Sequence, residues 1–164
     1  MVSTWFLTYG FADVHDDLLI GAYPVDESDV AMLERLGIER VLNLVDDREY
    51  KPGERETVET GYLGAGIEEK RISLEDFGNL PDGELDEAVA IVLGWLKDGK
   101  RVYVHCRAGW QRSAAVAAGV VAITDGIDID DALDLVQRRK PSADPLPHQR
   151  EDLRRWWGPR ETAQ

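Results

Sequence analysis

The 164-residue sequence predicts one α/β domain with a short, mostly parallel central sheet flanked by helices. The first half of the chain alternates an apolar run (18–22), a stretch with helical spacing (26–37) and a second apolar run (40–45). Farther along, an apolar strand (101–104) leads through a turn into a long run of small apolar residues (114–123), which is typical of a buried helix. Both patterns indicate parallel strands joined by right-handed crossovers.

The remaining elements of the first half follow from caps and composition. The N-terminal segment is expected to pack an aromatic edge against the core through Trp5, Phe6, Tyr9 and Phe11. Asp26 stands where an N-cap would, and Gly37 is a natural helix end. The strand over 40–45 is apolar nearly throughout, which predicts cover on both faces. The polar stretch 46–66 is interpreted as a surface crossover with one helix near 54–60.

The second half continues the alternation. A third strand is expected over 70–74, followed by an acidic loop rich in turn-forming residues (75–83). An amphipathic helix over 85–96 precedes the strand that leads to the small-residue helix. One further helix is capped by Asp128 and ended by Pro141, and the last runs over 148–157. Without an internal repeat or linker, the prediction is a single domain over 1–164 with its core at about 18–157.

Composition narrows the class of protein and its surroundings. Apolar content of 43% and charged content of 31% are ordinary for a soluble globular domain, and no run is long enough to span a membrane. The N-terminus lacks a basic start and an apolar stretch, so no signal peptide is expected. The single cysteine excludes an intramolecular disulfide and fits a reducing, cytoplasmic setting. Scattered histidines give no ligand spacing, and neither metal nor cofactor is expected.

The net charge of −13 also bears on partners. Such an acidic chain argues against nucleic acid and anionic membranes as general partners. The charge is uneven, because residues 138–164 carry 7 bases against 4 acids. The sequence leaves the oligomeric state open.

One stretch combines the end of a strand, a turn and the start of a helix. Residues 104–113 read Val-His-Cys-Arg-Ala-Gly-Trp-Gln-Arg-Ser. Backbone N–H groups and the positive end of a helix dipole suit an anion here, and the same field favours a thiolate at Cys106. Arg112 returns at the helix start with a planar fork of donors that matches phosphate oxygens. The pattern predicts a phosphate cradle with a nucleophile in its floor.

His-Cys-x-x-Gly-x-x-Arg-Ser in this stretch resembles the signature loop of the cysteine-based protein phosphatases. The short chain is similar to their dual-specificity branch. The first half agrees, since it runs Ile-Gly-x-x-Pro, helix, Gly-Ile and Val-x-Asn-Leu. The resemblance covers residues 18–157 and implies metal-independent hydrolysis of phosphomonoesters. The implied substrate is a phosphorylated protein bearing phosphotyrosine, with phosphoserine and phosphothreonine also considered, or a phosphorylated lipid or small molecule.

Roles follow for the residues of the signature loop. Cys106 would attack phosphorus and form a phosphocysteine. The backbone N–H groups would hold the phosphate oxygens, which Arg112 would clamp. The substrate-binding set is therefore Arg107, Ala108, Gly109, Trp110, Gln111 and Arg112. The Ser113 hydroxyl would stabilise the departing thiolate, although a helix-start serine is also an ordinary cap. The resemblance implies that His105 supports the loop by hydrogen bonding.

A general acid must protonate the leaving oxygen. The resemblance places it in a loop about thirty residues before the nucleophile, where Asp76 stands. Glu75 and Asp82 are rivals, and all three are also suited to a solvated turn.

Several features leave alternatives open. Trp110 and Gln111 would make the pocket rim bulky, and Arg107 would hold a polyanion or serve as a simple rim charge. Gln149 would position the hydrolytic water or lie on a polar helix surface. The basic run 138–140 would approach a second phosphate or end a helix favourably. A catalytically idle phosphate-binding module and a sulfurtransferase are the rival functions.

Overall fold

The computed structural model describes residues 1–161, so residues 162–164 of the expected domain lie outside the described part. Its centre is a five-stranded sheet in the order β1-β2-β5-β3-β4. The strands are β1 (Phe11–His15), β2 (Leu18–Gly21), β3 (Arg40–Asn43), β4 (Glu68–Arg71) and β5 (Val102–His105). Only the β1–β2 pair is antiparallel. The predicted fold class, a short and mostly parallel sheet flanked by helices, is confirmed.

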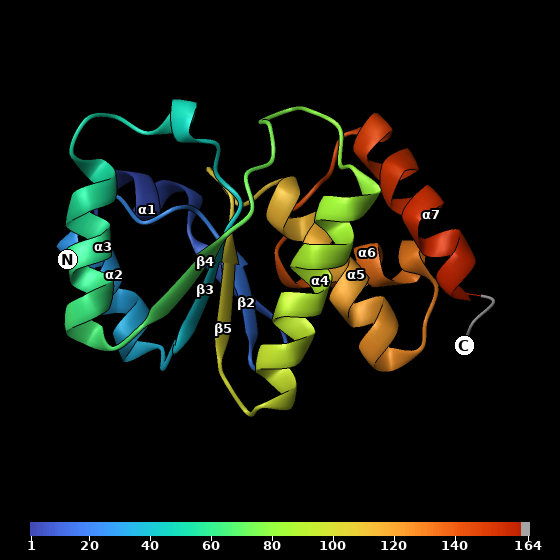
Figure 1. Cartoon of the computed structure of the whole chain (residues 1–164), viewed down its shortest axis with the longest axis horizontal. Helices are drawn as coiled ribbons and strands as arrows, with labels where there is room; N and C mark the ends of the chain where they lie inside the picture. The colour runs from blue at the N-terminus through green and yellow to red at the C-terminus, as the bar shows by residue number, and fades with distance from the viewer. Residues whose placement is uncertain (162–164) are drawn as a thin grey trace.

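Helices cover both faces of the sheet (Figure 1). On one face lie α1 (Thr4–Tyr9), α2 (Glu27–Arg35) and α3 (Glu54–Ala65). On the other lie α4 (Asp82–Lys97), α5 (Arg112–Asp125), α6 (Ile129–Arg139) and α7 (Pro147–Glu161). A short 3₁₀ helix, η1 (Asp47–Glu49), follows β3. The acidic side chain of Asp128 caps α6 as expected, by accepting the N–H of Asp130.

Two apolar clusters form because strand side chains alternate between the faces. On β2, Leu18 and Ile20 belong to the cluster under α4–α7, whereas Leu19 belongs to the cluster under α1–α3. Val104 and Tyr103 on β5 divide in the same way. This double cover explains why the inner strands are apolar nearly throughout, as the sequence indicated.

The predicted buried central helix is α5. Its residues from Arg112 to Ala122 are all buried. Small side chains permit this, since neighbouring elements approach α5 closely. A Cβ on Gly119 would lie 3.0 Å from Val89 and 3.1 Å from Trp156, for example. The helix that begins at the signature loop is therefore fixed on every side.

The structure differs from the sequence expectations at the sheet edges. Residues 1–17 form α1 and β1, where only an aromatic edge was expected. The third strand, predicted over 70–74, is β4 at Glu68–Arg71. This strand is charged throughout because it lies at the edge and is largely exposed. Residues 72–74 still run alongside the chain that leaves β3, since Leu74 N donates to the Leu44 carbonyl at 3.2 Å.

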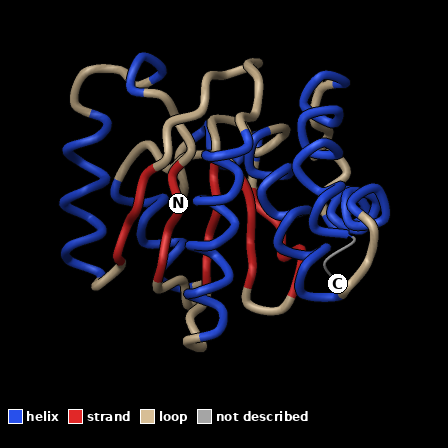
Figure 2. The backbone as a smooth tube through the Cα atoms, turned by 45° about the vertical axis from the view of Figure 1, so that its right-hand side comes forward, coloured by secondary structure: helices blue, strands red, loops and turns tan. Residues whose placement is uncertain are grey.

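Parallel pairing places three loops at one edge of the sheet. Since β3, β4 and β5 run in the same direction, the chain leaves all three strands at their shared carboxyl edge. There the η1 segment, the acidic loop and the signature loop follow their strands, and Figure 2 shows loops at this end of the strands. This edge is where α/β folds commonly place their functional groups.

The buried carboxylate of Asp29 fastens α1 to this frame. It is 0% exposed and accepts hydrogen bonds from Ser3 N at 2.8 Å, Ser3 Oγ at 2.6 Å and Val25 N at 2.9 Å. Asp29→Ala should lower the free energy of unfolding by about 2–4 kcal/mol, because buried donors lose their acceptor. Chemical denaturation measures this loss. Glu34→Ala, an exposed change on the same helix, should stay within about 0.5 kcal/mol; an equal effect of both would contradict the assignment.

Candidate active site

Cys106 lies in the floor of the signature loop, between β5 and α5. Its side chain is 2% exposed, and its Sγ lies 3.3 Å from Ser113 Oγ in the first turn of α5. The structure thus brings together the two residues that the sequence assigned to the nucleophile and to thiolate stabilisation. The start of α5 adds a positive helix end beside the thiol.

A close backbone approach fixes the loop against β2. Gly109 has φ 77°, and a Cβ there would lie 2.6 Å from the Gly21 carbonyl carbon. Only glycine satisfies both constraints. The loop carbonyls are held as well, because the Arg107 carbonyl accepts from Tyr23 N at 3.0 Å and the Trp110 carbonyl from Asp144 N at 2.6 Å. The loop is therefore held before any ligand binds.

His105 is buried beneath the loop. It is 1% exposed, and its Nδ1 lies 3.1 Å from the Cys106 carbonyl oxygen. Burial lowers the pKa of His105 to about 4, so the ring is neutral near pH 7. A neutral, inaccessible ring touching the loop backbone fits support of the loop.

Arg112 is the most heavily paired group at the site. Its guanidinium is 1% exposed and binds Glu49 through Nη1 at 2.7 Å and Nη2 at 2.8 Å. Nη1 also donates to the Leu74 carbonyl at 3.0 Å. Burial alone would lower the pKa of Arg112, but the Glu49 carboxylate and nearby charges raise it overall. The site thus holds a permanent cation.

Glu49 is a residue that the sequence reasoning missed. It lies in the stretch interpreted only as a surface crossover. A signal was present, since Asp46 and Glu49 have the spacing of a capping box. Both bonds of that box form in η1.

Of the three candidate acids, Asp76 alone lies at the pocket. Its Oδ1 is 3.1 Å from Arg112 Nη2, and its side chain is 31% exposed. Glu75 is exposed and does not line the pocket, whereas Asp82 pairs with Arg155 on the surface at 3.2 Å. Phe77, next to Asp76, has φ 62°, a conformation that a bulky residue adopts only under constraint. The geometry favours Asp76.

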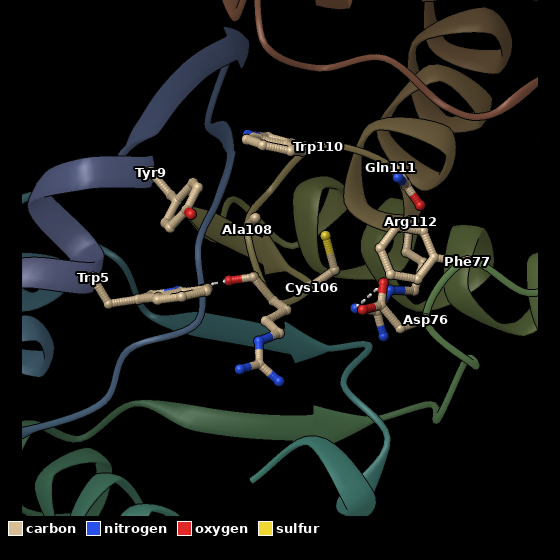
Figure 3. Close-up of a pocket in the computed structure, with 10 residues that line it drawn as sticks. Trp5, Tyr9, Asp76, Phe77, Cys106, Ala108, Trp110, Gln111 and Arg112 are labelled. Atoms are coloured by element: carbon tan, nitrogen blue, oxygen red, sulfur yellow. Dashed lines mark hydrogen bonds and ion pairs between the residues drawn. The ribbon is translucent and has the colours of Figure 1, made fainter. Parts of the chain in front are cut away.

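These groups surround a pocket of about 340 Å³. Figure 3 shows the rings of Trp5, Tyr9 and Trp110 on one side of Cys106, and Asp76, Phe77 and Arg112 on the other. The remaining lining residues are Arg107, Ala108 and Gln111. We call the three rings on the first side the aromatic wall. Ring centroids lie 4.4 Å apart for Trp5 and Tyr9, and 5.5 Å apart for Tyr9 and Trp110.

Gln149 is not on a polar helix surface, so that alternative is wrong. It is 0% exposed, accepts from Leu146 N at 2.9 Å and donates to the Gly78 carbonyl at 3.1 Å. Gln149 does not line the pocket but ties α7 to the loop that carries Asp76.

The basic run 138–140 is not gathered at the pocket. Arg139 lines a separate hollow with His15 and Asp125, and Lys140 is 5% exposed with its Nζ donating to Ser142 Oγ at 2.7 Å. Gln111, by contrast, lines the active pocket, and its buried Oε1 has no hydrogen-bond partner among the described residues.

Within residues 1–161, no helix combines the length and apolar character that crossing a membrane requires. Over the same residues, no group of three or more His, Cys, Asp or Glu side chains is placed to hold a metal ion.

Solved structures with similar folds include phosphatases. Tk-PTP in the active form superposes with a TM-score of 0.76 at 24% identity, covering 88% of this chain and 95% of that one. PTPMT1 in complex with PI(5)P gives a TM-score of 0.79 at 21% identity, covering 93% and 97%. At these identities the likeness shows the fold.

Sequence comparison shows the family. The chain is 33% identical to mouse Dual specificity protein phosphatase 12 over 84 residues, which are 49% of this chain and only 25% of that relative. It is 25% identical over 138 residues to mouse Phosphatidylglycerophosphatase and protein-tyrosine phosphatase 1, covering 84% of this chain and 70% of the relative. Residues 18–157 match the family model of the dual specificity phosphatase catalytic domain. The chain therefore belongs to the dual specificity phosphatase family.

Proposed function

We propose that this enzyme hydrolyses phosphomonoesters through a cysteinyl-phosphate intermediate on Cys106. The observation that carries the proposal is the convergence of the Cys106 thiol, the Arg112 guanidinium and the Asp76 carboxyl group on one pocket. Nucleophile, anion clamp and proton donor are the groups that such a displacement needs. The loop N–H groups and Arg112 supply the positive field, so the chemistry calls for no metal.

In the first step, the thiolate attacks phosphorus and the bond to the ester oxygen breaks. Asp76 gives its proton to that leaving oxygen. In the second step, Asp76 accepts a proton from water, whose oxygen attacks phosphorus, and the S–P bond breaks. The Ser113 hydroxyl, 3.3 Å from Sγ, donates to the thiolate as it re-forms. Inorganic phosphate then leaves.

The aromatic wall favours an aryl phosphate, above all phosphotyrosine. Trp5, Tyr9 and Trp110 offer ring faces and edges to a phenyl group that enters above Cys106. Phosphoserine and phosphothreonine are further candidate protein substrates of the same pocket. A reducing, cytoplasmic location would keep the single catalytic thiol in its reduced form.

A phosphoinositide or another polyanion is the second candidate substrate. One relative is named both a phosphatidylglycerophosphatase and a protein-tyrosine phosphatase, and one similar structure holds PI(5)P. The pocket provides little free positive charge for a polyanion, because the Arg112 guanidinium already pairs with the Glu49 and Asp76 carboxylates. Comparing kcat/KM for phosphotyrosine peptides, phosphoserine and phosphothreonine peptides, and short-chain phosphoinositides separates the candidates.

Cys106→Ser is the first test. It should lower turnover of an aryl phosphate by roughly 10⁴-fold or more, because a serine hydroxyl has no comparable anion to attack phosphorus. Binding of inorganic phosphate should persist, since the loop and Arg112 are intact. Release of inorganic phosphate measures turnover, and calorimetry measures binding. A Cys106→Ser protein that works at the wild-type rate would end the proposal, and an idle binding module would instead show no wild-type turnover.

Asp76→Asn tests the general acid. Phenyl phosphate, a poor leaving group, should lose about 10²–10⁴-fold in kcat, whereas an activated nitrophenyl ester should lose roughly tenfold or less. The ratio of the two rates is the measurement. Asp82→Asn and Glu75→Gln serve as controls and should leave that ratio unchanged. Equal losses for both esters in Asp76→Asn would refute its role as the acid.

Burial of His105 beneath the loop predicts that the free energy of unfolding depends on pH. Because burial lowers its pKa from 6.5 to about 4, the unfolded chain takes up the proton first as the pH falls. Stability is therefore lost between about pH 6.5 and 4, by about 3 kcal/mol from this residue. Denaturation of the wild type and of His105→Asn across this range measures the difference. Parallel curves for the two proteins would contradict it.

A further inference from the structure

Glu49 is held by both arginines of the signature loop. Its carboxylate accepts from Arg112 Nη1 at 2.7 Å and Nη2 at 2.8 Å. Its main-chain carbonyl accepts from Arg107 Nη1 at 3.3 Å. The short 3₁₀ helix after β3 is thus joined to the loop that carries the nucleophile at two points.

The Glu49 carboxylate is preorganised. Its Oε2 also accepts the N–H of Asp46 at 2.7 Å, and the Asp46 side chain accepts the N–H of Arg48 at 2.9 Å. The Glu49 side chain is only 10% exposed. A partly buried carboxylate fixed by its own capping box is a built part of the site, unlike a mobile surface ion pair.

The bond to Glu49 leaves one donor of Arg112 available. Arg112 lines the pocket and Glu49 does not, so the carboxylate approaches the guanidinium away from the ligand. The Arg112 Nε is buried and has no hydrogen-bond partner among the described residues. An unpaired buried donor is destabilising, and a phosphate oxygen would provide the missing acceptor.

The Arg107 guanidinium contacts aromatic rings as well as the Glu49 carbonyl. Its guanidinium lies 5.2 Å from the Trp5 ring and 6.0 Å from the Tyr23 ring. Its carbonyl accepts from Trp5 Nε1 at 2.9 Å. Arg107 therefore joins the aromatic wall to the η1 segment, with its charge satisfied by rings and by the Glu49 carbonyl.

We propose that Arg107 is a positioning residue that acts through Glu49. By holding the Glu49 backbone, it keeps the carboxylate against Arg112 and orients that guanidinium for phosphate. It does not itself hold a second phosphate group of the substrate. The inference rests on the proposed function in one respect, namely that Arg112 binds the phosphate.

A double-mutant cycle tests the coupling. The probe is tungstate, a phosphate mimic whose affinity is measured by calorimetry and requires no turnover. Glu49→Gln should weaken tungstate binding by roughly 10- to 100-fold, and Arg107→Met by roughly 3- to 10-fold. The double variant should bind as Glu49→Gln does, within about twofold, because Arg107 then has no oriented carboxylate to support. Losses that multiply would overturn the proposal.

A substrate comparison provides a second readout. Arg107→Met should lower kcat/KM by the same factor for a phosphotyrosine peptide and a short-chain phosphoinositide. A loss confined to the phosphoinositide would show that Arg107 contacts a polyanion and would overturn the proposal. Arg107→Lys should recover part of the tungstate affinity, because its ammonium can still donate to a carbonyl.

The matched control is Lys51→Met, which removes the same single charge from an exposed side chain two positions after Glu49. Its tungstate affinity should stay within about twofold of the wild-type value. That result would show that the effect of Arg107 depends on its contacts and not on long-range charge. Thermal unfolding of each variant shows whether it is folded, and if the double variant is not, the substrate comparison still decides. Because tungstate binding is independent of chemistry, failure of this proposal and failure of the Cys106 mechanism are separable.

Discussion

The buried guanidinium of Arg112 is the constraint on which the rest of the site depends. A cation with 1% exposure is tolerated only when carboxylates and carbonyls surround it. Here those partners come from the ends of two strands and the loops after them: Glu49 in η1, the Leu74 carbonyl beyond β4, and Asp76 in the acidic loop. The parallel sheet makes this possible, because it delivers all three segments to the same edge. The hydrogen bonds and ion pairs of Arg112 therefore fix Asp76, the signature loop and the η1 segment relative to one another.

Much of this arrangement was predictable from the sequence, for physical reasons. The inner strands and α5 are apolar on both faces, so the length of each continuous apolar run and the residues that flank it reveal them. The spacing of Cys106, Gly109 and Arg112 indicated the loop, since it resembles the family's signature and lies where a helix start suits an anion. The edge strands of the sheet were harder to predict from the sequence. Each Glu68–Arg71 side chain is polar because β4 has an open side, and nothing in its pattern separates a strand from a loop. The role of Glu49 and the burial of Gln149 were not evident, because a polar residue looks the same in sequence whether solvent or a buried partner satisfies it.

The pocket gains its chemical character from outside the signature loop. Residues 1–17, which carry no strong periodic signal, fold into α1 and place Trp5 and Tyr9 opposite Asp76 (Figure 3). The buried Asp29 carboxylate holds that helix in place. The result is a site with a single deep cation and an aromatic wall, whereas Arg107, the charge that first suggested a polyanion, is stacked on Trp5 and bonded to Glu49. The apolar surface beside the phosphate position is the basis of the proposed preference for an aryl ester.

If the phosphoryl group passes through Cys106, the covalent intermediate can be trapped. Enzyme mixed with an aryl phosphate, quenched in acid within milliseconds and digested should yield a phosphorylated peptide that contains Cys106. The fraction labelled should rise in Ser113→Ala, where the departing thiolate loses its hydrogen-bond donor at 3.3 Å. Rapid turnover without phosphate on that peptide, or with phosphate on another residue, would contradict the account.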